Sequence, residues 1–227
     1  NMILIFDIGN TNIHIGYFRN EKLFLTKKWR TKKGLNKSLL KRLLYKKNIR
    51  GIGIASVVPS LNQKLHSLLT NDCPIKVFTV NSRIKMPVKI AYNNLGADRI
   101  ANINGAYIYY KDNLIVFSFG TAITGDVVFK NGSHKGGLII PGPEIQLWGL
   151  RQKTALIRNI NLINSPPLLG KNTDECVQSG IINGIKFSIE RFIKEISKIY
   201  KKDFQIIATG GWAEKICHLI PEISKFE

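Results

Sequence analysis

The chain is poor in acidic residues and in cysteine, and it contains no long hydrophobic run. Only 15 Asp and Glu stand against 34 Lys and Arg, so the formal net charge is +19. Three scattered cysteines without metal-site spacing favour reduced thiols in a cytoplasm: Cys73, Cys176 and Cys217. No apolar run approaches the roughly 18 residues that span a bilayer. The run at 2–6 is too short for a signal peptide, so we expect a cytoplasmic protein with no membrane segment.

The content of apolar residues, in contrast, is ordinary for a globular protein. The 227 residues are 44% hydrophobic, which allows a substantial core in one large domain or two small ones. The excess positive charge is concentrated in residues 25–48, which hold ten Lys or Arg and no acid. This stretch is either a nucleic-acid or anionic-surface patch, or a solvated helix face. We favour the solvated face, because aromatics are sparse there, and we do not expect nucleic acid as a partner.

Residues 2–18 carry the most informative pattern of the chain. The apolar run at 2–6 predicts a buried strand, and the alternation at 12–17 predicts a second strand returning beside it. A glycine in the turn lets backbone N–H groups approach phosphate oxygens, and a carboxylate can hold magnesium. The turn therefore suits a nucleoside triphosphate, although its residues are also ordinary turn formers: Asp7, Gly9, Thr11 and Asn12.

The same layout returns in residues 114–129. Phe6-Asp7-Ile8-Gly9 aligns with Phe117-Ser118-Phe119-Gly120, which lies 111 residues later, about half the chain. Two phosphate-type hairpins spaced in this way favour a duplicated fold that clamps one nucleotide between its halves. Strands and helices alternate in both halves, which predicts an α/β architecture. We place the boundary between the predicted halves, 1–112 and 113–227, just before the repeat.

Two later segments combine polar residues with predicted turns. The loop at 87–96 runs into a helix predicted to reach Tyr110, with Asp98 and Arg99 in its first turn. The positive end of a helix favours the acid but not the arginine, so Arg99 requires another explanation. Gly210-Gly211 follows a predicted strand and precedes a short helix. Such a pair forms an adenine or phosphate platform, or a plain β–α turn.

The remaining features are weak signs of chemistry. Residues 173–200 form the longest helical pattern, in which Gly180 and Gly184 predict close packing of another helix. The chain has no Walker A pattern, no GxSxG elbow and no His–Glu zinc motif. The four histidines are isolated, so we interpret each as structural or exposed rather than as a ligand: His14, His66, His134 and His218.

Together these pieces resemble the type III pantothenate kinases of the acetate-and-sugar-kinase/actin-like ATPase superfamily. The matching motifs stand in the family's order and cover nearly the whole chain: DIGNTN (7–12), SVVPS (56–60), GADR (96–99), FGTA (119–122), GG and IPG within 136–142, GKNTDECVQSG (170–180) and ATGG (208–211). DIGNTN, GADR and the second hairpin are specific in combination and weak one by one. The resemblance implies a duplicated ribonuclease-H-like, actin-like ATPase fold with a nucleotide cleft.

The same resemblance implies an activity and an ATP site. The γ-phosphoryl group of ATP would pass to the 4′-hydroxyl of pantothenate, the first committed step toward coenzyme A. Asp7 would hold Mg²⁺, and Gly210 and Gly211 would lie beside the adenosine. The full set implied for ATP is Asp7, Ile8, Gly9, Asn10, Thr11, Asn12, Thr121, Gly210 and Gly211.

Pantothenate is implied to bind in a site built at a homodimer interface. Asp98 would accept the proton of the hydroxyl as the bond to phosphorus forms, because a primary alcohol is too weak an acid to ionise first. Arg99 would pair with the carboxylate of pantothenate. The residues implied for this site are Tyr92, Gly96, Ala97, Arg99 and Thr173.

The chain departs from the family pattern in three places. Ser118 stands where the family has an acid that helps to hold an activating monovalent cation, K⁺ or NH₄⁺. A carboxylate about 4 Å from a cation contributes up to roughly 4 kcal/mol at an effective dielectric near 20, so the cation dependence and the activity itself come into question. Ile123 replaces a small hydroxyl residue. At the ends, Asn1 precedes Met2 and is interpreted as an added residue, and the family's closing strand or helix is expected to be missing.

Two other functions stay open at this stage. An impaired family member could serve as a basic regulatory or nucleic-acid-binding protein, as the +19 charge and Ser118 suggest. Salt-sensitive binding to DNA without phosphorylation of pantothenate would favour that function. The third is another kinase or ATPase of the superfamily, which a panel of hydroxyl acceptors would reveal.

Overall fold

The protein is described by a computed structural model that covers residues 2–45, 48–70 and 75–226. The chain divides into two compact units, Asn1–Lys85 with Tyr92–Ala101, and Met86–Ala91 with Asn102–Glu227. Predictions for Asn1, for residues 46–47 of the basic stretch and for Cys73 lie outside the described residues. The boundary that we placed between residues 112 and 113 stays a prediction.

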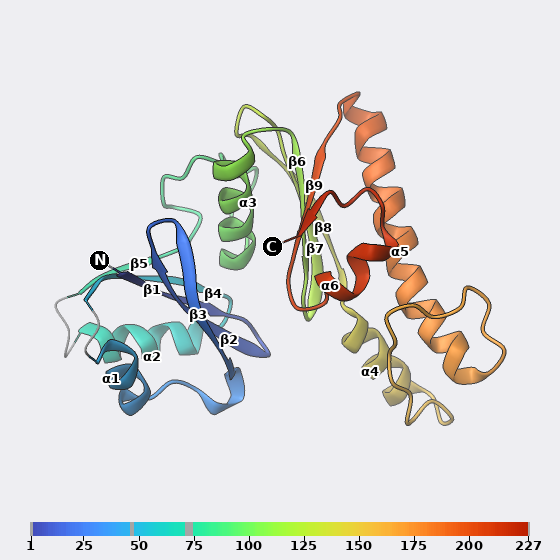
Figure 1. Ribbon diagram of the computed structural model, residues 1–227, viewed down its shortest axis with the longest axis horizontal. Helices are drawn as coiled ribbons and strands as arrows, with labels where there is room; N and C mark the ends of the chain where they lie inside the picture. Colours follow the sequence, from blue (N-terminus) through green and yellow to red (C-terminus); the bar gives the residue numbers. More distant parts are fainter. Residues whose placement is uncertain (1, 46–47, 71–74, 227) are drawn as a thin grey trace. The chain divides into compact units, whose positions relative to one another are not determined.

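A five-stranded sheet organises the first unit (Figure 1). Its strand order is β3-β2-β1-β4-β5, with antiparallel pairing from β1 to β3 and parallel pairing from β1 to β5. The predicted hairpin is therefore present as β1 and β2. The elements are β1 (Met2–Ile8), β2 (Asn12–Arg19), β3 (Lys22–Arg30), the 3-10 helix η1 (Thr31–Lys33), α1 (Lys37–Leu44), β4 (Ile49–Ser56), α2 (Pro59–Thr70) and β5 (Lys76–Thr79).

Alternation along β1 decides which face of this sheet is buried. Leu4, Phe6 and Ile8 are completely buried, whereas Asp7 between them is exposed. The buried side chains pack with apolar residues of α1 and α2, which lie on the same side of the sheet in Figure 1. Burying a side chain of this size stabilises the fold by about 1.5–3 kcal/mol. The opposite face of the hairpin end is thereby left to polar residues.

A second five-stranded sheet, β10-β9-β6-β7-β8, organises the second unit. Helices α4, α5 and α6 contribute to one core with the inward residues of this sheet. Helix α3 (Ala97–Tyr110) begins in the first unit and ends in the second. The other elements are β6 (Leu114–Phe119), β7 (Ala122–Val128), β8 (His134–Pro141), α4 (Pro143–Lys153), α5 (Thr173–Tyr200), β9 (Gln205–Thr209), α6 (Ala213–Ile216), the 3-10 helix η2 (Cys217–Leu219) and β10 (Lys225–Phe226).

The two sheets share one topology, which confirms the predicted duplication. In each sheet a central strand pairs antiparallel with its hairpin partner and parallel with a strand on its other side. Asp7 of β1 corresponds to Ser118 of β6, because each is the last residue but one of its strand and lies one residue before the final pair of its hairpin. The core residues correspond as well, since Leu4, Phe6 and Ile8 are replaced by the equally buried Ile115, Phe117 and Phe119.

One sequence-based expectation is wrong. Gly180 and Gly184 of α5 do not mark close helix packing, because a Cβ atom at either position would meet no neighbouring element within 4 Å. After the glycine pair the chain forms a strand of two residues, β10, which pairs with β9. The absence of the family's closing strand or helix stays a prediction. The thiols of Cys176 and Cys217 are free, as expected, and burial raises the pKa of Cys217 to about 11. Within the described ranges, no helix has both the length and the apolar character to cross a membrane.

Candidate active site

The turn between β1 and β2 is closed by backbone bonds and by one side chain from β3's end. Within the turn, the Gly9 N–H donates to the Asn12 carbonyl at 2.9 Å. Thr31 then fastens the turn from outside, since its Oγ1 donates to the Gly9 carbonyl at 2.7 Å and its N–H to the Thr11 carbonyl at 3.0 Å. Sequence reasoning missed Thr31, because nothing near it in the chain marks a long-range partner.

Within this turn the predicted ATP residues divide by exposure. Asn10 and Thr11 are exposed and Asn12 is half-buried, so their side chains are accessible to a ligand. Ile8 is completely buried, so only its backbone could contact phosphate. A Cβ atom at Gly9 would lie 3.2 Å from the Asn12 carbonyl oxygen, a tight contact that a larger residue would have to relieve by moving the turn.

Two other titratable groups of the first unit, His14 and Asp98, shift the pKa of Asp7. Although part of Asp7 reaches solvent, protein atoms surround most of its carboxyl, and this loss of water raises its pKa above the ordinary 3.8. The negative charge of Asp98 raises the pKa further. His14, its direct partner across the hairpin, lowers the pKa of Asp7. The predicted metal ligand and the predicted proton acceptor, 91 positions apart in the sequence, therefore lie within electrostatic reach of each other.

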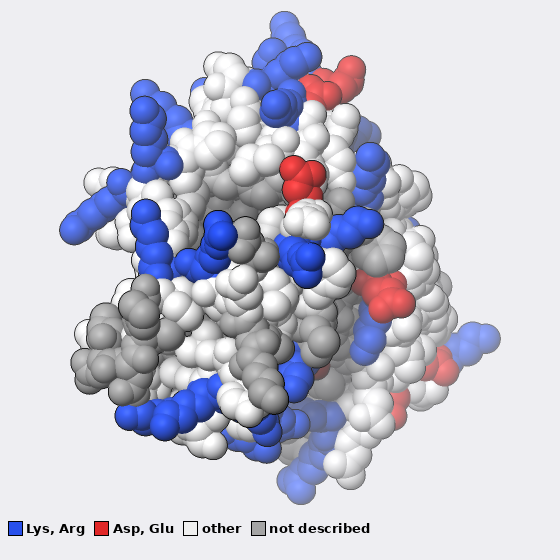
Figure 2. All heavy atoms as spheres, turned by 60° about the vertical axis from the view of Figure 1, so that its left-hand side comes forward, with Lys and Arg blue, Asp and Glu red and all other residues white. Residues whose placement is uncertain are grey.

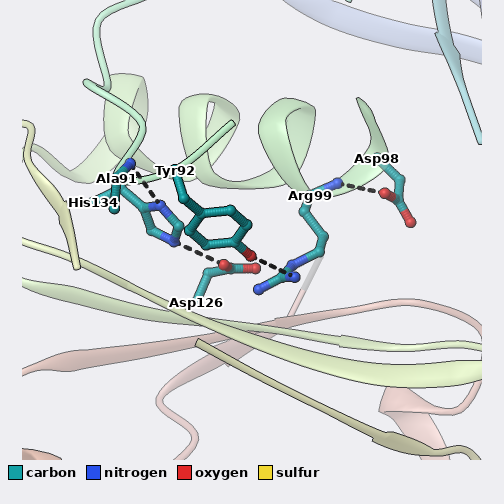
Figure 3. A network of polar contacts seen from close by, with 6 residues as sticks. All are labelled: Ala91, Tyr92, Asp98, Arg99, Asp126 and His134. Atoms are coloured by element: carbon teal, nitrogen blue, oxygen red, sulfur yellow. Dashed lines mark hydrogen bonds and ion pairs between the residues drawn. The ribbon is translucent and has the colours of Figure 1, made fainter. Parts of the chain in front are cut away.

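Segment 92–99, which ends in the first turn of α3, carries Tyr92, Arg99 and the predicted proton acceptor Asp98 (Figure 3). Arg99 is buried, and its Nη1 donates to the Tyr92 hydroxyl at 3.0 Å. The half-buried Asp98 accepts a bond from the Arg99 N–H through Oδ1 at 2.8 Å. A Cβ atom at Gly96 would lie 2.7 Å from that same oxygen, which explains the glycine of the GADR motif. Ala97 is buried, so only its backbone could contact a substrate.

In the second unit the second hairpin and the glycine pair meet. Gly210 has φ +101°, and a Cβ atom there would lie 2.6 Å from the Phe119 carbonyl. The N–H of Trp212, just after Gly211, donates to that carbonyl at 3.0 Å. Exposed Thr121 lies in the same turn and accepts a bond from the Gly142 N–H at 3.0 Å through its carbonyl. Thr121, Gly210 and Gly211 thus lie around the end of one strand, β6.

Ser118 lies in a row of hydroxyl side chains across three strands. Its direct neighbours are Thr124 on β7 and Thr209 on β9, and all three residues are half-buried. Ile123, the other departure from the family pattern, is completely buried and faces the core. The row offers neutral oxygen atoms only, so it lacks the charge with which a carboxylate attracts a cation.

Thr173 occupies a different part of the second unit. It is the first residue of α5, whose start is capped by Asn172, because Asn172 Oδ1 accepts from the Glu175 N–H, while Glu175 Oε2 accepts from the Lys171 N–H. Thr173 also lines an apolar groove of about 900 Å³ between α4 and α5. Among the residues that line it are Pro141, Ile145, Leu150, Ile157, Val177 and Ile181.

A buried histidine–carboxylate pair is a feature that sequence reasoning did not find. His134 Nε2 and Asp126 Oδ1 lie 2.9 Å apart, and both side chains are almost inaccessible to water. The Ala91 N–H donates to His134 Nδ1 at 3.4 Å, which leaves Nε2 to donate to the carboxylate (Figure 3). The strand segment around Lys89 is also held by backbone bonds to Gly132 and His134. The pair thus anchors the chain directly before Tyr92.

The donor atoms fit a magnesium ion better than a monovalent one. Mg²⁺ is bound through one or two carboxylates together with substrate phosphates, and Asp7 with Asp98 nearby supplies that chemistry. The described part of the chain has no group of three or more His, Cys, Asp or Glu that would form a cage of protein ligands.

Known proteins similar to this chain identify its family. The family model of the type III pantothenate kinases matches residues 3–195. A curated type III pantothenate kinase of Sulfurihydrogenibium sp. (strain YO3AOP1) is 38% identical over 222 residues, which are 92% of this chain and 88% of that protein.

Solved structures support the fold independently. A Campylobacter jejuni protein proposed as a Baf family transcriptional activator superposes with a TM-score of 0.63 at 21% identity, covering 99% of this chain and 90% of its own. A Listeria monocytogenes protein proposed as an N-acetylmannosamine kinase superposes with a TM-score of 0.53 at 13% identity, covering 100% and 92%. At such identities the likeness concerns the fold alone, which is that of the actin-like ATPases and sugar kinases. The family model and the curated relative go further, and on their account this chain belongs to the type III pantothenate kinase family.

Proposed function

We propose that this chain transfers the γ-phosphoryl group of ATP to the 4′-hydroxyl of pantothenate, the first step toward coenzyme A. Membership of the family supports the choice of substrate. The observation that carries the proposal is the electrostatic coupling of Asp7, at the phosphate-type turn, with Asp98, at the start of α3. A carboxylate for the metal and a carboxylate for the acceptor hydroxyl are what a phosphoryl transfer to an alcohol requires.

Asp98 is the proposed proton acceptor. One of its oxygens, Oδ1, is held by the Arg99 N–H, which orients the carboxylate. The other oxygen is then available to the substrate hydroxyl, whose proton leaves as the bond to phosphorus forms. General-base assistance of this kind contributes about 10²–10⁴-fold to the rate.

Arg99 and Tyr92 are proposed to bind pantothenate. The guanidinium of Arg99 is oriented by the Tyr92 hydroxyl, and an arginine binds a carboxylate through two parallel hydrogen bonds. Binding the carboxylate end of pantothenate fixes the approach of its hydroxyl end, and positioning together with electrostatic stabilisation supplies most of the catalysis of phosphoryl transfer.

The two hairpins are proposed to bind ATP. In the first unit Gly9, Asn10 and Thr11 would contact phosphate oxygens, and Asp7 would hold Mg²⁺, which neutralises the charge that develops on the phosphates. In the second unit Thr121 would contact phosphate, and the exposed Gly210 and Gly211 would lie beside the adenosine. The absence of side chains at the glycine pair supports close approach of a flat ring.

The need for a monovalent cation is proposed to be weak. The Ser118, Thr124 and Thr209 hydroxyls carry no charge, and a missing carboxylate forfeits up to roughly 4 kcal/mol of attraction for a cation about 4 Å away. We expect less than about a threefold change in turnover when K⁺ is replaced by an organic cation. A larger change would show that the hydroxyl row holds the ion adequately.

We further propose a homodimer that assembles through the α4–α5 side of the second unit. Large apolar side chains are exposed there, on α4 and on the segment leading into α5: Trp148 (62%), Leu156 (90%), Leu168 (64%) and Leu169 (81%). The apolar groove that Thr173 lines is also formed by residues of α4 and α5, and a contiguous exposed apolar patch is typical of an interaction site. A second copy seated there would place Thr173 at the interface, consistent with its proposed role toward pantothenate.

One experiment tests the activity directly. Purified protein is incubated with MgATP and pantothenate, with and without K⁺, and the product is identified by mass spectrometry. A product heavier by one phosphoryl group at the 4′-oxygen supports the proposal. Phosphorylation of other alcohols only would show a different kinase, and absence of product together with salt-sensitive DNA binding would favour the basic regulatory protein.

A further inference from the structure

We propose that the side chains of His14, Lys28 and Arg30 form a phosphate-binding strip beside the Asp7 hairpin and contact the polyphosphate of the nucleotide. Lys28 and Arg30 belong to the segment of concentrated positive charge, residues 25–48, that the proposed catalytic residues leave unused. The proposal deepens the ATP site described above and therefore rests on the proposed function.

Strand register places the three basic residues next to the phosphate-type turn. Asp7 faces His14 across the first hairpin, and His14 faces Lys28 across the second. Two residues nearer the turn, and so on the same face, Asn12 faces Arg30. Directly opposed residues of antiparallel strands extend their side chains from the same face, with Cβ atoms about 4.5–5.5 Å apart. Hence the strip continues the face of Asp7 across β2 and β3.

The end of β3 is held against the turn rather than left loose. Thr31 follows Arg30 directly, and it donates one bond to the Gly9 carbonyl and another to the Thr11 carbonyl. Arg30 is therefore adjacent in the chain to Thr31, the residue that joins the end of β3 to the phosphate-type turn. The register shift in the β2–β3 pairing lies farther along, between Ile15 and Tyr17, and does not disturb this end.

The charges of the strip are accessible to a ligand. His14, Lys28 and Arg30 are exposed, and neither Lys28 nor Arg30 forms an ion pair with any described residue. The side chain of His14 is close enough to lower the pKa of Asp7, which agrees with the register. Figure 2 shows many Lys and Arg side chains on the visible face of the molecule and few Asp and Glu among them.

The fold itself does not require these charges. The second unit repeats the topology, and there Thr124 faces Ile139 where His14 faces Lys28. Likewise Ala122 faces Pro141 where Asn12 faces Arg30. The duplicated sheet is thus formed with neutral residues at the equivalent positions, and the basic strip is particular to the first unit.

Protection of an exposed sheet edge is the competing explanation, since lysines on edge strands prevent pairing with other chains. β3 is an edge strand of the first sheet. That protection acts through either face of the strand, whereas phosphate binding needs the face that carries Asp7. Lys27 is exposed on the same strand, but it faces Ile15 and belongs to the opposite face. Lys27 is therefore a matched control with the same charge.

Equilibrium titration of the full chain with ATP, ADP and adenosine tests the strip. The variant carrying Lys28→Gln and Arg30→Gln should bind ATP about tenfold more weakly, the change expected from losing one charge-assisted hydrogen bond. Its affinity for ADP should fall less, and its affinity for adenosine should not change. His14→Asn should weaken ATP binding by roughly twofold to fivefold. Lys27→Gln should leave all three affinities within about twofold of the wild type.

The outcomes separate this inference from the proposed function. If the wild type phosphorylates pantothenate but the double variant binds ATP as Lys27→Gln does, the strip is refuted and the kinase stands. If ATP affinity falls selectively in the double variant but no phosphopantothenate forms, the strip stands and the choice of acceptor is wrong. An equal loss of adenosine and ATP affinity would also refute the strip, because it would indicate a disturbed fold. A wild type that binds no nucleotide would overturn both.

Discussion

The bond from Thr31 to Gly9 makes a sharp test of how the phosphate-type turn is held. Thr31→Val removes the hydroxyl and keeps the shape of the side chain. The lost bond is short, at 2.7 Å, and Thr31 is half-buried. A neutral hydrogen bond contributes about 0.5–1.5 kcal/mol net, and leaving a shielded carbonyl unpaired raises the cost to about 1–3 kcal/mol. Since water can reach part of this turn, we expect a loss near 1 kcal/mol in the free energy of unfolding.

The assay combines global and local measurements. Urea unfolding gives the loss in stability, and hydrogen exchange reports the turn through the Gly9 amide, which donates to the Asn12 carbonyl. A destabilisation of about 1 kcal/mol that is confined to the turn speeds exchange of this amide about fivefold. ATP affinity should fall by a similar factor, because the turn must be closed again before it binds phosphate.

Thr31→Ser supplies the control, since it keeps the hydroxyl and loses only a methyl group. It should retain the exchange rate and ATP affinity of the wild type to within about twofold. The reasoning would be refuted if Thr31→Val left both quantities unchanged, or if the serine variant lost as much as the valine variant. In the first case the backbone bond from Thr31 to Thr11 suffices, and in the second the methyl packing matters rather than the hydroxyl.

Three further predictions concern the carboxylates and the second hairpin. Asp98→Asn should lower turnover about 10²–10⁴-fold in a coupled kinase assay while ATP affinity stays within about threefold, and unchanged turnover would remove Asp98 as the base. Asp7→Asn should stabilise the fold near pH 7, where the wild type carries a charge that the fold disfavours. The gain should vanish in thermal unfolding as the pH falls toward 3.8, whereas a gain that persists there would contradict the raised pKa of Asp7. Gly142→Ala should destabilise by about 1–3 kcal/mol in urea unfolding, because its Cβ would lie 2.5 Å from the Thr121 carbonyl. Gly105→Ala, in open space within α3, should instead stabilise by about 0.5–1 kcal/mol, and equal effects would mean that the turn yields.

Local patterns in the sequence were sufficient for the strands and helices that carry the site. The apolar runs before Asp7 and Ser118 alternate or continue in the manner of buried strands, and both form the central strand of a sheet. The predicted placement of Asp98 and Arg99 in the first turn of a helix is confirmed by α3. The reason is that strand burial and helix starts depend on residues within a few positions, which a single sequence displays.

Long-range partners were not predictable in the same way. The clamp from Thr31, the anchoring of Ala91 by His134, and the bond from Arg99 to Tyr92 join groups with no local signature. The prediction for Gly180 and Gly184 failed for a related reason, because the space beside a glycine depends on which element packs there.

The sequence by itself determined the repeated strand–turn–strand plan, the family and the types of side chain available for phosphate, metal and proton transfer. The tertiary structure decided which of these side chains meet. Only the folded sheet brings Asp7 within electrostatic reach of Asp98, and only its register sets His14 and Lys28 in line with Asp7 while turning Lys27 away. The physical reason is that side chains alternate between the two faces of a strand, so a function shared by several strands depends on their register, which distant parts of the chain set together.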